Sequence, residues 1–207
     1  MAQPKAWARA QEIAHHAGKP VTAQIVQAAV QELRPPPTAI NVTADTIYPP
    51  VLDVCCGSRM MWFDRKTPQA LFVDKRAENH VLCDGRLVEI APDVQSDFES
   101  LPFPSETFYL VAYDPPHMTS LGENSWMAKK YGRLTGDWKP MIKAGFEECF
   151  RVLKPNGVLV FKWSEASVRS KDVLELSPVP PLFGHTTGRQ AKTIWATFMK
   201  PGREDAR

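Results

Sequence analysis

The 207-residue sequence predicts an α/β domain with a mainly parallel sheet, and two patterns lead to that prediction. From Tyr48 onward, short and fully apolar runs alternate with longer helical or polar segments. Fully apolar strands separated by helices are typical of parallel sheets that are covered on both faces. The stretch 173–200 differs, because two strand-like runs flank a turn with Gly, Thr and Arg, and no clear helix lies between them. That ending predicts a terminal hairpin with an antiparallel strand.

Two helices are expected ahead of the sheet. Residues 4–18 and 20–33 both carry apolar residues at helical spacing, and Thr22 is a suitable N-cap for the second helix. The Arg-Pro-Pro-Pro run that follows ends this helix, because proline removes a backbone donor and clashes with the preceding turn. We therefore expect a helical hairpin over residues 1–38 and a main domain over residues 39–207. The hairpin is either a packing or dimerisation arm or an element that contacts DNA.

The elements of the main domain are predicted in a simple order. Strands are expected at 49–57, 70–76, 93–98 and 108–116, followed by a helix at 141–157 and a strand at 157–163. In an open parallel sheet, ligands bind beyond the carboxyl ends of the strands, where the strand order reverses. The residues that end these strands are therefore the first candidates for a site.

Composition and charge narrow the class of protein. The formal net charge is +2, so attraction to nucleic acid has to come from a local patch rather than from the whole surface. No apolar run approaches the roughly 20 residues that cross a bilayer, which predicts no membrane partner. The N-terminus lacks the apolar core of a secretory signal, so we expect a cytoplasmic protein. The four cysteines form no C-x-x-C pattern, so we expect reduced packing residues and no metal site.

Acidic residues follow three successive predicted strands. Asp53 ends the first strand just before Gly57, where a dinucleotide-binding chain would carry G-x-G-x-x-G. A carboxylate there repels phosphate and attracts an amine or a sulfonium, which favours a nucleoside without phosphates over NAD. Asp74 ends the second strand, at a distance from Gly57 that suits hydrogen bonds to two ribose hydroxyls. Asp97 follows the third strand and is placed to reach an adenine amino group or a bound water. Each acid alone fits a turn or a cap, but three in order favour a site.

These segments resemble the successive motifs of class I S-adenosylmethionine-dependent methyltransferases. The likeness covers roughly residues 51–163 and lies in VLDVCCGS, VDKR, DFESLPFPSETFYLVAYDPP and ECFRVLKPNGVLVFKW, in the order usual for that family. It implies a Rossmann-like fold with a seven-stranded sheet whose last strand is antiparallel, and S-adenosylmethionine as the cofactor. The residues that it places at the cofactor are Asp53, Cys55, Gly57, Asp74, Lys75, Asp97 and Phe98. The family usually has further glycines where Cys55 and Cys56 stand, so the turn departs from the family pattern.

The Asp-Pro-Pro-His group resembles the D/N/S-P-P-aromatic motif of amino methyltransferases, which methylate exocyclic amines of adenine or cytosine in nucleic acids. That resemblance makes Asp114, Pro115, Pro116 and His117 the catalytic candidates. The lone pair of an aromatic amine is conjugated with its ring, so two rigid acceptors, the Asp114 carboxylate and the Pro115 carbonyl, would bind both N–H groups and turn the lone pair toward the methyl donor. His117 stands where an aromatic side chain normally stacks on the extruded base. Alternatively, His117 acts as a general base for a different acceptor.

Basic and aromatic residues are interleaved in the stretch 118–140 that follows. This mixture suits a nucleic-acid backbone with splayed bases. It also fits an amphipathic helix that packs Trp126 and Tyr131 into the core. A second basic turn, before the last strand, either contacts phosphates or is only the solvent-exposed loop of a hairpin. The candidate substrate-binding residues are Trp126, Lys129, Lys130, Tyr131, Arg133, His185, Arg189 and Lys192.

The leading hypothesis is methyl transfer to adenine N6 in a nucleic acid, with DNA preferred over RNA. Cytosine N4 also fits, because the same acceptors serve either amine. No separate target-recognition domain fits in the chain, which predicts relaxed sequence specificity or help from a second subunit, as in the compact phage and prophage enzymes that it resembles. One alternative is a methyltransferase for RNA, a protein or a small molecule with His117 as base. The other is a non-enzymatic nucleic-acid-binding module.

Overall fold

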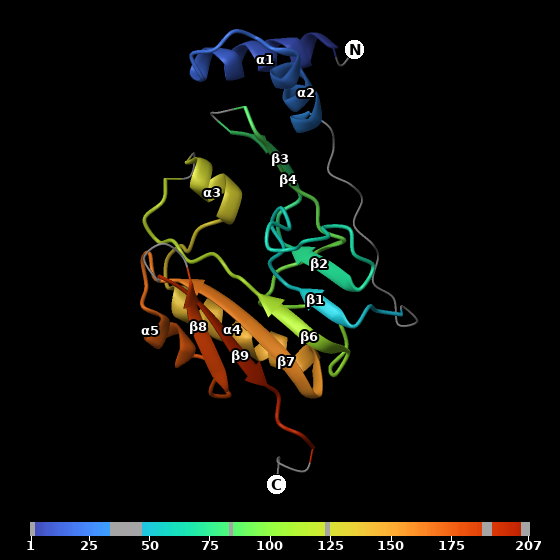
Figure 1. Ribbon diagram of the computed structural model, residues 1–207, viewed down its shortest axis with the longest axis vertical. Coiled ribbons are helices and arrows are strands. Elements are labelled where there is room, and N and C mark those ends of the chain that lie inside the picture. The colour runs from blue at the N-terminus through green and yellow to red at the C-terminus, as the bar shows by residue number, and fades with distance from the viewer. Residues whose placement is uncertain (1–2, 34–46, 83–84, 123–124, 188–191, 204–207) are drawn as a thin grey trace.

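The computed structural model describes residues 3–33, 47–82, 85–122, 125–187 and 192–203, and these residues form a seven-stranded sheet (Figure 1). The strand order is β5-β2-β1-β6-β7-β9-β8. The strands are β1 Val51–Asp53, β2 Ala70–Asp74, β5 Val94–Gln95, β6 Phe108–Tyr113, β7 Leu153–Ser164, β8 Phe183–Thr187 and β9 Thr193–Met199. β9 runs antiparallel to both of its neighbours, and the other pairs are parallel. The predicted Rossmann-like α/β fold, with a mainly parallel sheet and an antiparallel last strand, is confirmed.

The strand order reverses between β1 and β6. From β1 the chain continues to β2 and β5 on one side of the sheet, and from β6 it continues to β7 on the other. In open α/β sheets, ligands bind in the crevice beyond the carboxyl ends of the strands at such a switch point. Asp53 of β1 is paired with Phe72 of β2 and Ala112 of β6, so the residues that follow these positions lie side by side.

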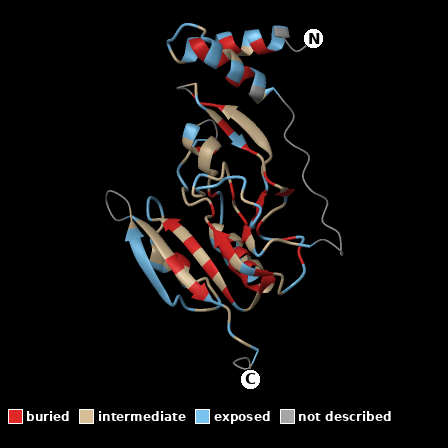
Figure 2. Ribbon diagram, turned by 45° about the vertical axis from the view of Figure 1, so that its right-hand side comes forward, coloured by how far each residue is buried: buried red, intermediate tan, exposed pale blue. Residues whose placement is uncertain are grey.

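The helix α4, Trp138–Val152, covers one face of the sheet and is capped by the side chain of Asp137. Its buried residues pack on β6 and β7, and Figure 2 shows how buried and partly exposed residues alternate along β7. Gly145 allows the closest approach, because a Cβ at this position would lie 2.1 Å from the Tyr113 hydroxyl. This packing fixes Tyr113, the last residue of β6, and so the backbone that leads into Asp114.

The connections on the β2 side differ from the predicted alternation of strands and helices. A loop joins β1 to β2, and β2 leads into a hairpin of β3, Glu78–Val81, and β4, Leu87–Ile90, which forms a separate two-stranded sheet. Trp62 of the loop packs edge-on against Phe72 and takes part of the place of a covering helix. The loop holds Gly, Ser, Asp, Thr and Pro at short intervals, and these residue types favour turns over a helix.

The tail forms the expected terminal hairpin from β8 and β9. The first strand-like run of the stretch 173–200 is not part of it. Its first two residues, Val173 and Leu174, instead end a short helix, α5, Ser170–Leu174. This helix buries Val173 in the same core as the apolar residues of α4.

The helices α1, Gln3–His16, and α2, Ala23–Glu32, form the expected N-terminal hairpin. The Thr22 hydroxyl accepts a hydrogen bond from the backbone of Ile25 at 3.3 Å, which confirms the N-cap. Apolar side chains of both helices pack together and against the β3–β4 hairpin, at the far end of the molecule from the C-terminus (Figure 1). The predicted boundary near residue 38 lies outside the described residues. None of the helices in the described ranges is long and apolar enough to cross a membrane.

Candidate functional site

Two adjoining cavities lie at the carboxyl ends of β1, β2 and β6, with volumes of about 480 and 70 Å³. Asp114 lines both of them, together with Cys55, Arg76 and Tyr131. The larger cavity also contains Asp74, Lys75, Phe98, Pro116, Lys129 and Arg133. The smaller one also contains Asp53, Gly57, Pro115, His117, Lys130 and Lys162. The structure thus brings the first two acidic strand ends and the Asp-Pro-Pro-His group to one place.

Asp53 is a buried carboxylate with neutral partners. Its side chain accepts a hydrogen bond from the indole nitrogen of Trp62 at 2.7 Å and from the backbone of Cys55 at 3.2 Å. The residue is only 1% exposed. Burial, with smaller contributions from the charges of Asp114 and Asp74, raises the pKa of Asp53 to about 7. The free protein therefore holds this carboxyl only partly ionised at neutral pH.

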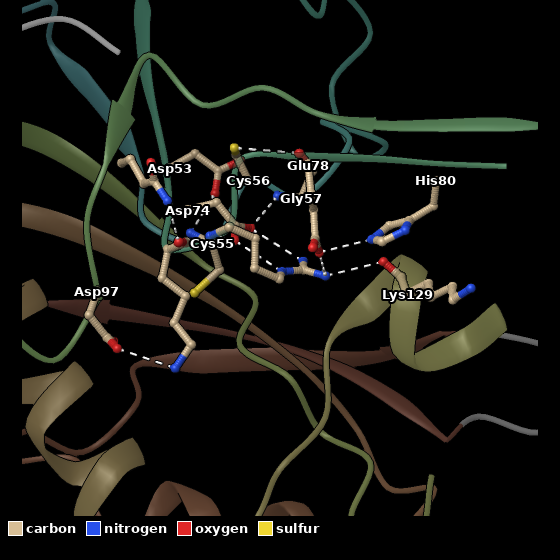
Figure 3. A network of polar contacts seen from close by, with 12 residues as sticks. Asp53, Cys55, Cys56, Gly57, Asp74, Glu78, His80, Asp97 and Lys129 are labelled. Carbon is tan, nitrogen blue, oxygen red and sulfur yellow. Dashed lines mark hydrogen bonds and ion pairs between the residues drawn. The ribbon is translucent and has the colours of Figure 1, made fainter. Parts of the chain in front are cut away.

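Asp74 ties the turn after β1 to the segment after β2. Its Oδ2 accepts a hydrogen bond from the backbone of Gly57 at 2.9 Å, and its Oδ1 accepts one from the backbone of Arg76, also at 2.9 Å. Gly57 has a φ of +48°, in the left-handed region that favours glycine. The Arg76 side chain donates to Asp74 and to the carbonyl of Lys129, both at 3.2 Å, and lies 3.7 Å from Glu78. Figure 3 labels these three partners, Asp74, Glu78 and Lys129, in one network of polar contacts. Arg76 therefore links the strand end to the β3–β4 hairpin and to the segment that follows the Asp-Pro-Pro-His group.

Asp97, the residue predicted to reach an adenine amino group or a bound water, is paired with Lys75. Lys75 Nζ is 3.3 Å from Asp97 Oδ2, and Asp97 Oδ1 accepts a hydrogen bond from the backbone of Glu99 at 3.2 Å. Asp97 lines neither cavity, whereas Phe98 lines the larger one. Phe98, which is 5% exposed and packs against Tyr113, therefore borders the space available to a ligand, and Asp97 does not.

The described cysteines, Cys55, Cys56 and Cys149, are free thiols. Burial raises the pKa of each of them well above its usual range, so they stay protonated at neutral pH. In the described part of the chain, no group of three His, Cys, Asp or Glu side chains is placed to hold a metal ion.

The two proposed acceptors of the Asp-Pro-Pro-His group are both engaged within the protein. Lys162 Nζ lies 2.5 Å from Asp114 Oδ2, and the ring nitrogen Nδ1 of His117 lies 3.3 Å from the Pro115 carbonyl oxygen. A carboxylate and a carbonyl can each accept more than one hydrogen bond, so an incoming amine can still reach both acceptors.

His117 is held as a neutral ring. Burial lowers its pKa below the usual range and outweighs the opposing effect of the Asp114 charge. Because the Pro115 carbonyl only accepts hydrogen bonds, Nδ1 carries the proton and Nε2 is the acceptor of the neutral ring. The ring packs edge-on toward Trp163, with centroids 5.9 Å apart.

The segment after the motif contains a short helix, α3, Trp126–Tyr131, capped by Ser125. The C-terminal end of α3 packs closely against the Asp-Pro-Pro-His group. Gly132 has a φ of +72°, and a Cβ there would lie 3.0 Å from the ring of Pro116. Lys129, Tyr131 and Arg133 line the larger cavity, while Trp126 is 44% exposed. The interpretation that packs Trp126 into the core is therefore wrong, and Ala128 is the buried residue of α3.

The second basic turn lies apart from the cavities. His185 of β8 and Lys192, just before β9, are exposed, and neither lines the two cavities. Arg189 lies outside the described residues. The structure therefore does not bring these candidates to the proposed acceptor group.

Sequence reasoning missed Trp62, Arg76 and Lys162. Lys162 had a signal, because it is the one charged residue in the apolar run 158–163 of β7. Arg76 had a weaker one, as a cation two positions after Asp74. The loop that carries Trp62 has no periodicity, so the contact of Trp62 with Asp53 had no signal in the sequence.

No family model matches the sequence, and no curated protein matches it. Solved structures similar to the chain include the antibiotic-resistance methyltransferase Kmr, at 12% identity and a TM-score of 0.48, covering 82% of this chain and 98% of Kmr. The N-methyltransferase NodS from Bradyrhizobium japonicum has 12% identity and a TM-score of 0.45, over 73% of this chain and 85% of NodS. A SAM-dependent methyltransferase from Methanosarcina mazei has 11% identity and a TM-score of 0.45, over 79% of this chain and 100% of its own.

Proposed function

We propose that the chain transfers a methyl group from S-adenosylmethionine to an exocyclic amine of a nucleic-acid base, with adenine N6 of DNA as the first target and a relaxed sequence preference. The observation that carries the proposal is the meeting of Asp53, Asp74 and the Asp114-Pro-Pro group at the switch point of the sheet. The first two acids suit a cationic nucleoside, and Asp114 with the Pro115 carbonyl suits an amine.

The side chains of the cavities fit a cationic nucleoside. Within the described residues Asp53 has only neutral hydrogen-bond partners, so a sulfonium or an α-amino group in the smaller cavity would supply the opposite charge. The larger cavity, at about 480 Å³, falls within the range of about 300–1,000 Å³ that is typical of ligand pockets. Asp74 and Phe98 line it and suit ribose hydroxyls and an adenine face.

The acceptor side needs rigid hydrogen-bond acceptors more than a strong base. S-Adenosylmethionine, when bound, supplies an electrophilic methyl group on a sulfonium. Asp114 and the Pro115 carbonyl accept the two N–H bonds of the amine and draw its lone pair out of conjugation with the ring. The methyl–sulfur bond breaks as the methyl–nitrogen bond forms, which leaves S-adenosylhomocysteine, and the methylated nitrogen becomes acidic and loses its proton to water. The prolines keep both oxygens in place, because their φ angles are restricted.

The segment around α3 supports a polynucleotide acceptor. Lys129 and Arg133 line the larger cavity and Trp126 is 44% exposed nearby in the same segment. Cations beside an exposed aromatic side chain suit phosphates with unstacked bases. An extruded or single-stranded base would then reach Asp114 along this segment.

Product analysis tests the proposal. The protein is incubated with S-adenosylmethionine and separate DNA and RNA pools, which are then digested to nucleosides and measured by mass spectrometry. We expect N6-methyladenine from DNA. N4-methylcytosine, or a product found only in RNA, would change the assigned target but support the assigned reaction. The absence of any methylated nucleoside from both pools would overturn the proposal.

The variant Asp114→Asn tests the assigned acceptor. It should lower transfer by about 100-fold, the size seen when one charge-stabilising group is removed from an active site. Cofactor binding should remain, and a ligand at one hundred times its Kd should still stabilise the fold by about 2.7 kcal/mol. Turnover equal to that of the wild type would refute the role of Asp114.

A second candidate function follows from the neutral ring of His117. A neutral imidazole with Nε2 as acceptor is suited to a general base, which a hydroxyl acceptor on a small molecule or RNA would require. The variant His117→Phe separates the two functions, because phenylalanine can stack on a base but cannot take a proton.

A further inference from the structure

We infer that Lys162 is a positioning residue that holds the Asp114 carboxylate toward the acceptor amine. The inference rests on the proposed function and adds a residue to it. The contact of Lys162 with Asp114, the residue directly after the neighbouring strand β6, motivates it.

The backbone places the two side chains together. The parallel register pairs Tyr113 of β6 with Phe161 of β7, so the next residues, Asp114 and Lys162, stand side by side. Phe161 and Trp163 are fully buried on the α4 face. Because side chains alternate along a strand, Lys162 points to the opposite face, where the smaller cavity lies.

The ammonium group of Lys162 has two partners at this position. Its Nζ lies 2.5 Å from Asp114 Oδ2 and 5.7 Å from the ring centroid of Trp195, the residue paired with it on β9. The side chains of Lys162 and Asp114 are only 27% and 22% exposed, so a lysine here is costly unless it is paired. The carboxylate and the indole together fix where the cation sits.

Carboxylates and cations both line the cavities. Asp53, Asp74 and Asp114 line them, and the charges of Asp114 and Asp74 contribute to the raised pKa of Asp53. Arg76 pairs with Asp74 at 3.2 Å, and Lys162 is the corresponding cation for Asp114. Without Lys162, Asp114 would lose its paired cation while the charge of Asp74 and of the ionised fraction of Asp53 remained, which should turn Asp114 toward solvent.

The pair also selects which oxygen serves the substrate. Lys162 binds Oδ2 of Asp114, which leaves Oδ1 to accept from the amine. Lys162 therefore acts through Asp114. Its loss should lower kcat and leave cofactor affinity unchanged.

The test compares three single variants with the wild type. Lys162→Met removes the charge and keeps the length of the side chain, and Lys162→Arg restores the charge. Lys154→Met is the matched control, since Lys154 lies on the same strand with Nζ 3.9 Å from the Tyr109 ring, far from the cavities. If Lys162→Met does not fold, Lys162→Gln replaces it with the same expectations.

We expect Lys162→Met to lower kcat by about tenfold or more, and Lys162→Arg to recover to within about threefold of the wild type. Cofactor Kd should stay within about twofold in all variants, and Lys154→Met should match the wild type. Combined with Asp114→Asn, Lys162→Met should cause no further loss of kcat, because each change alone already disrupts the same Lys162–Asp114 pair. A normal kcat for Lys162→Met, or a further tenfold loss in the double variant, would overturn the inference.

The failure of the proposed function can be told apart from the failure of this inference. If the wild type methylates no polynucleotide, the proposed function fails. Crystal structures of the wild type and of Lys162→Met then decide the role of Lys162 without any activity. An Asp114 carboxylate that turns out of the cavity in the variant supports positioning, and one that stays in place overturns it.

Discussion

The buried carboxyl of Asp53 should make the stability of the protein depend on pH. Burial, with smaller contributions from neighbouring carboxylates, raises its pKa from an ordinary value of 3.8 to about 7. Between these two values the folded state binds more protons than the unfolded state. The free energy of unfolding therefore falls as pH rises through this window and levels off above the folded pKa.

The size of the effect follows from the pKa difference. Between pH 5 and the folded pKa of about 7, the free energy of unfolding falls by about 1.4 kcal/mol per pH unit, or about 3 kcal/mol in total. The residue is 1% exposed, so solvent screens little of this. Asp53→Asn removes the titration but keeps only one acceptor oxygen for Trp62 and Cys55. The hydrogen bond that it loses costs about 1 kcal/mol at every pH.

Urea unfolding of the wild type and of Asp53→Asn at pH 5, 6, 7 and 8 measures the effect. The difference between the two free energies of unfolding should change by about 3 kcal/mol across the series, in favour of the variant at high pH. Other titrating groups, such as the salt-bridged Glu148, contribute equally to both proteins and cancel. Parallel curves for the two proteins would refute the reasoning.

Three further predictions concern residues around the site. His117→Phe should keep transfer within about threefold and His117→Ala should lose about 5- to 150-fold in steady-state rate, because stacking contributes about 1–3 kcal/mol; an inactive Phe variant would favour the base role. Replacing Lys129 and Lys130 by Ala should lower polynucleotide affinity and reduce the slope of log Kd against log salt by up to about two, measured by fluorescence anisotropy; an unchanged slope would exclude them from phosphate contact. Gly145→Ala should lower the free energy of unfolding by about 1–3 kcal/mol in urea, because its Cβ would overlap Tyr113; a loss below about 0.5 kcal/mol would mean that Tyr113 moves aside.

Much of the fold follows from local sequence patterns. The apolar runs of β2, β6 and β7 predict central strands, and the tail predicts the β8–β9 hairpin. The β3–β4 hairpin had no comparable signal, because each of its strands is only four residues long and part polar. Its burial depends on Val81 and Leu87 packing against α2, a contact made by a segment far away in the sequence. Tertiary packing, rather than strand propensity, therefore decides this element.

Part of the candidate site could also be predicted from local sequence, and part depends on tertiary contacts. Asp53, Asp74 and Asp114 were predictable, because a polar residue that ends an apolar strand stands out from it. Lys162 also stands out in its apolar run, but its pairing with Asp114 was not predictable, because it depends on the register of β6 and β7 across 48 positions of sequence. The place of Asp97 relative to the cavities depends on the turn that follows it, in which its Oδ1 accepts a hydrogen bond from the backbone of Glu99.

The pairing of charges in the cavities leads to a last prediction, on cofactor binding. Arg76 and Lys162 pair with Asp74 and Asp114, whereas Asp53 has only neutral partners among the described residues and a pKa of about 7. A bound cation favours the ionised carboxylate, so binding should release a proton near neutral pH. Affinity for S-adenosylmethionine should then rise about tenfold between pH 6 and pH 8. Titration calorimetry in buffers of different ionisation enthalpy measures both the affinity and the number of protons released. Asp53→Asn is the control and should bind more weakly with no such trend. A Kd that does not change with pH in the wild type would mean that the cation does not bind beside Asp53.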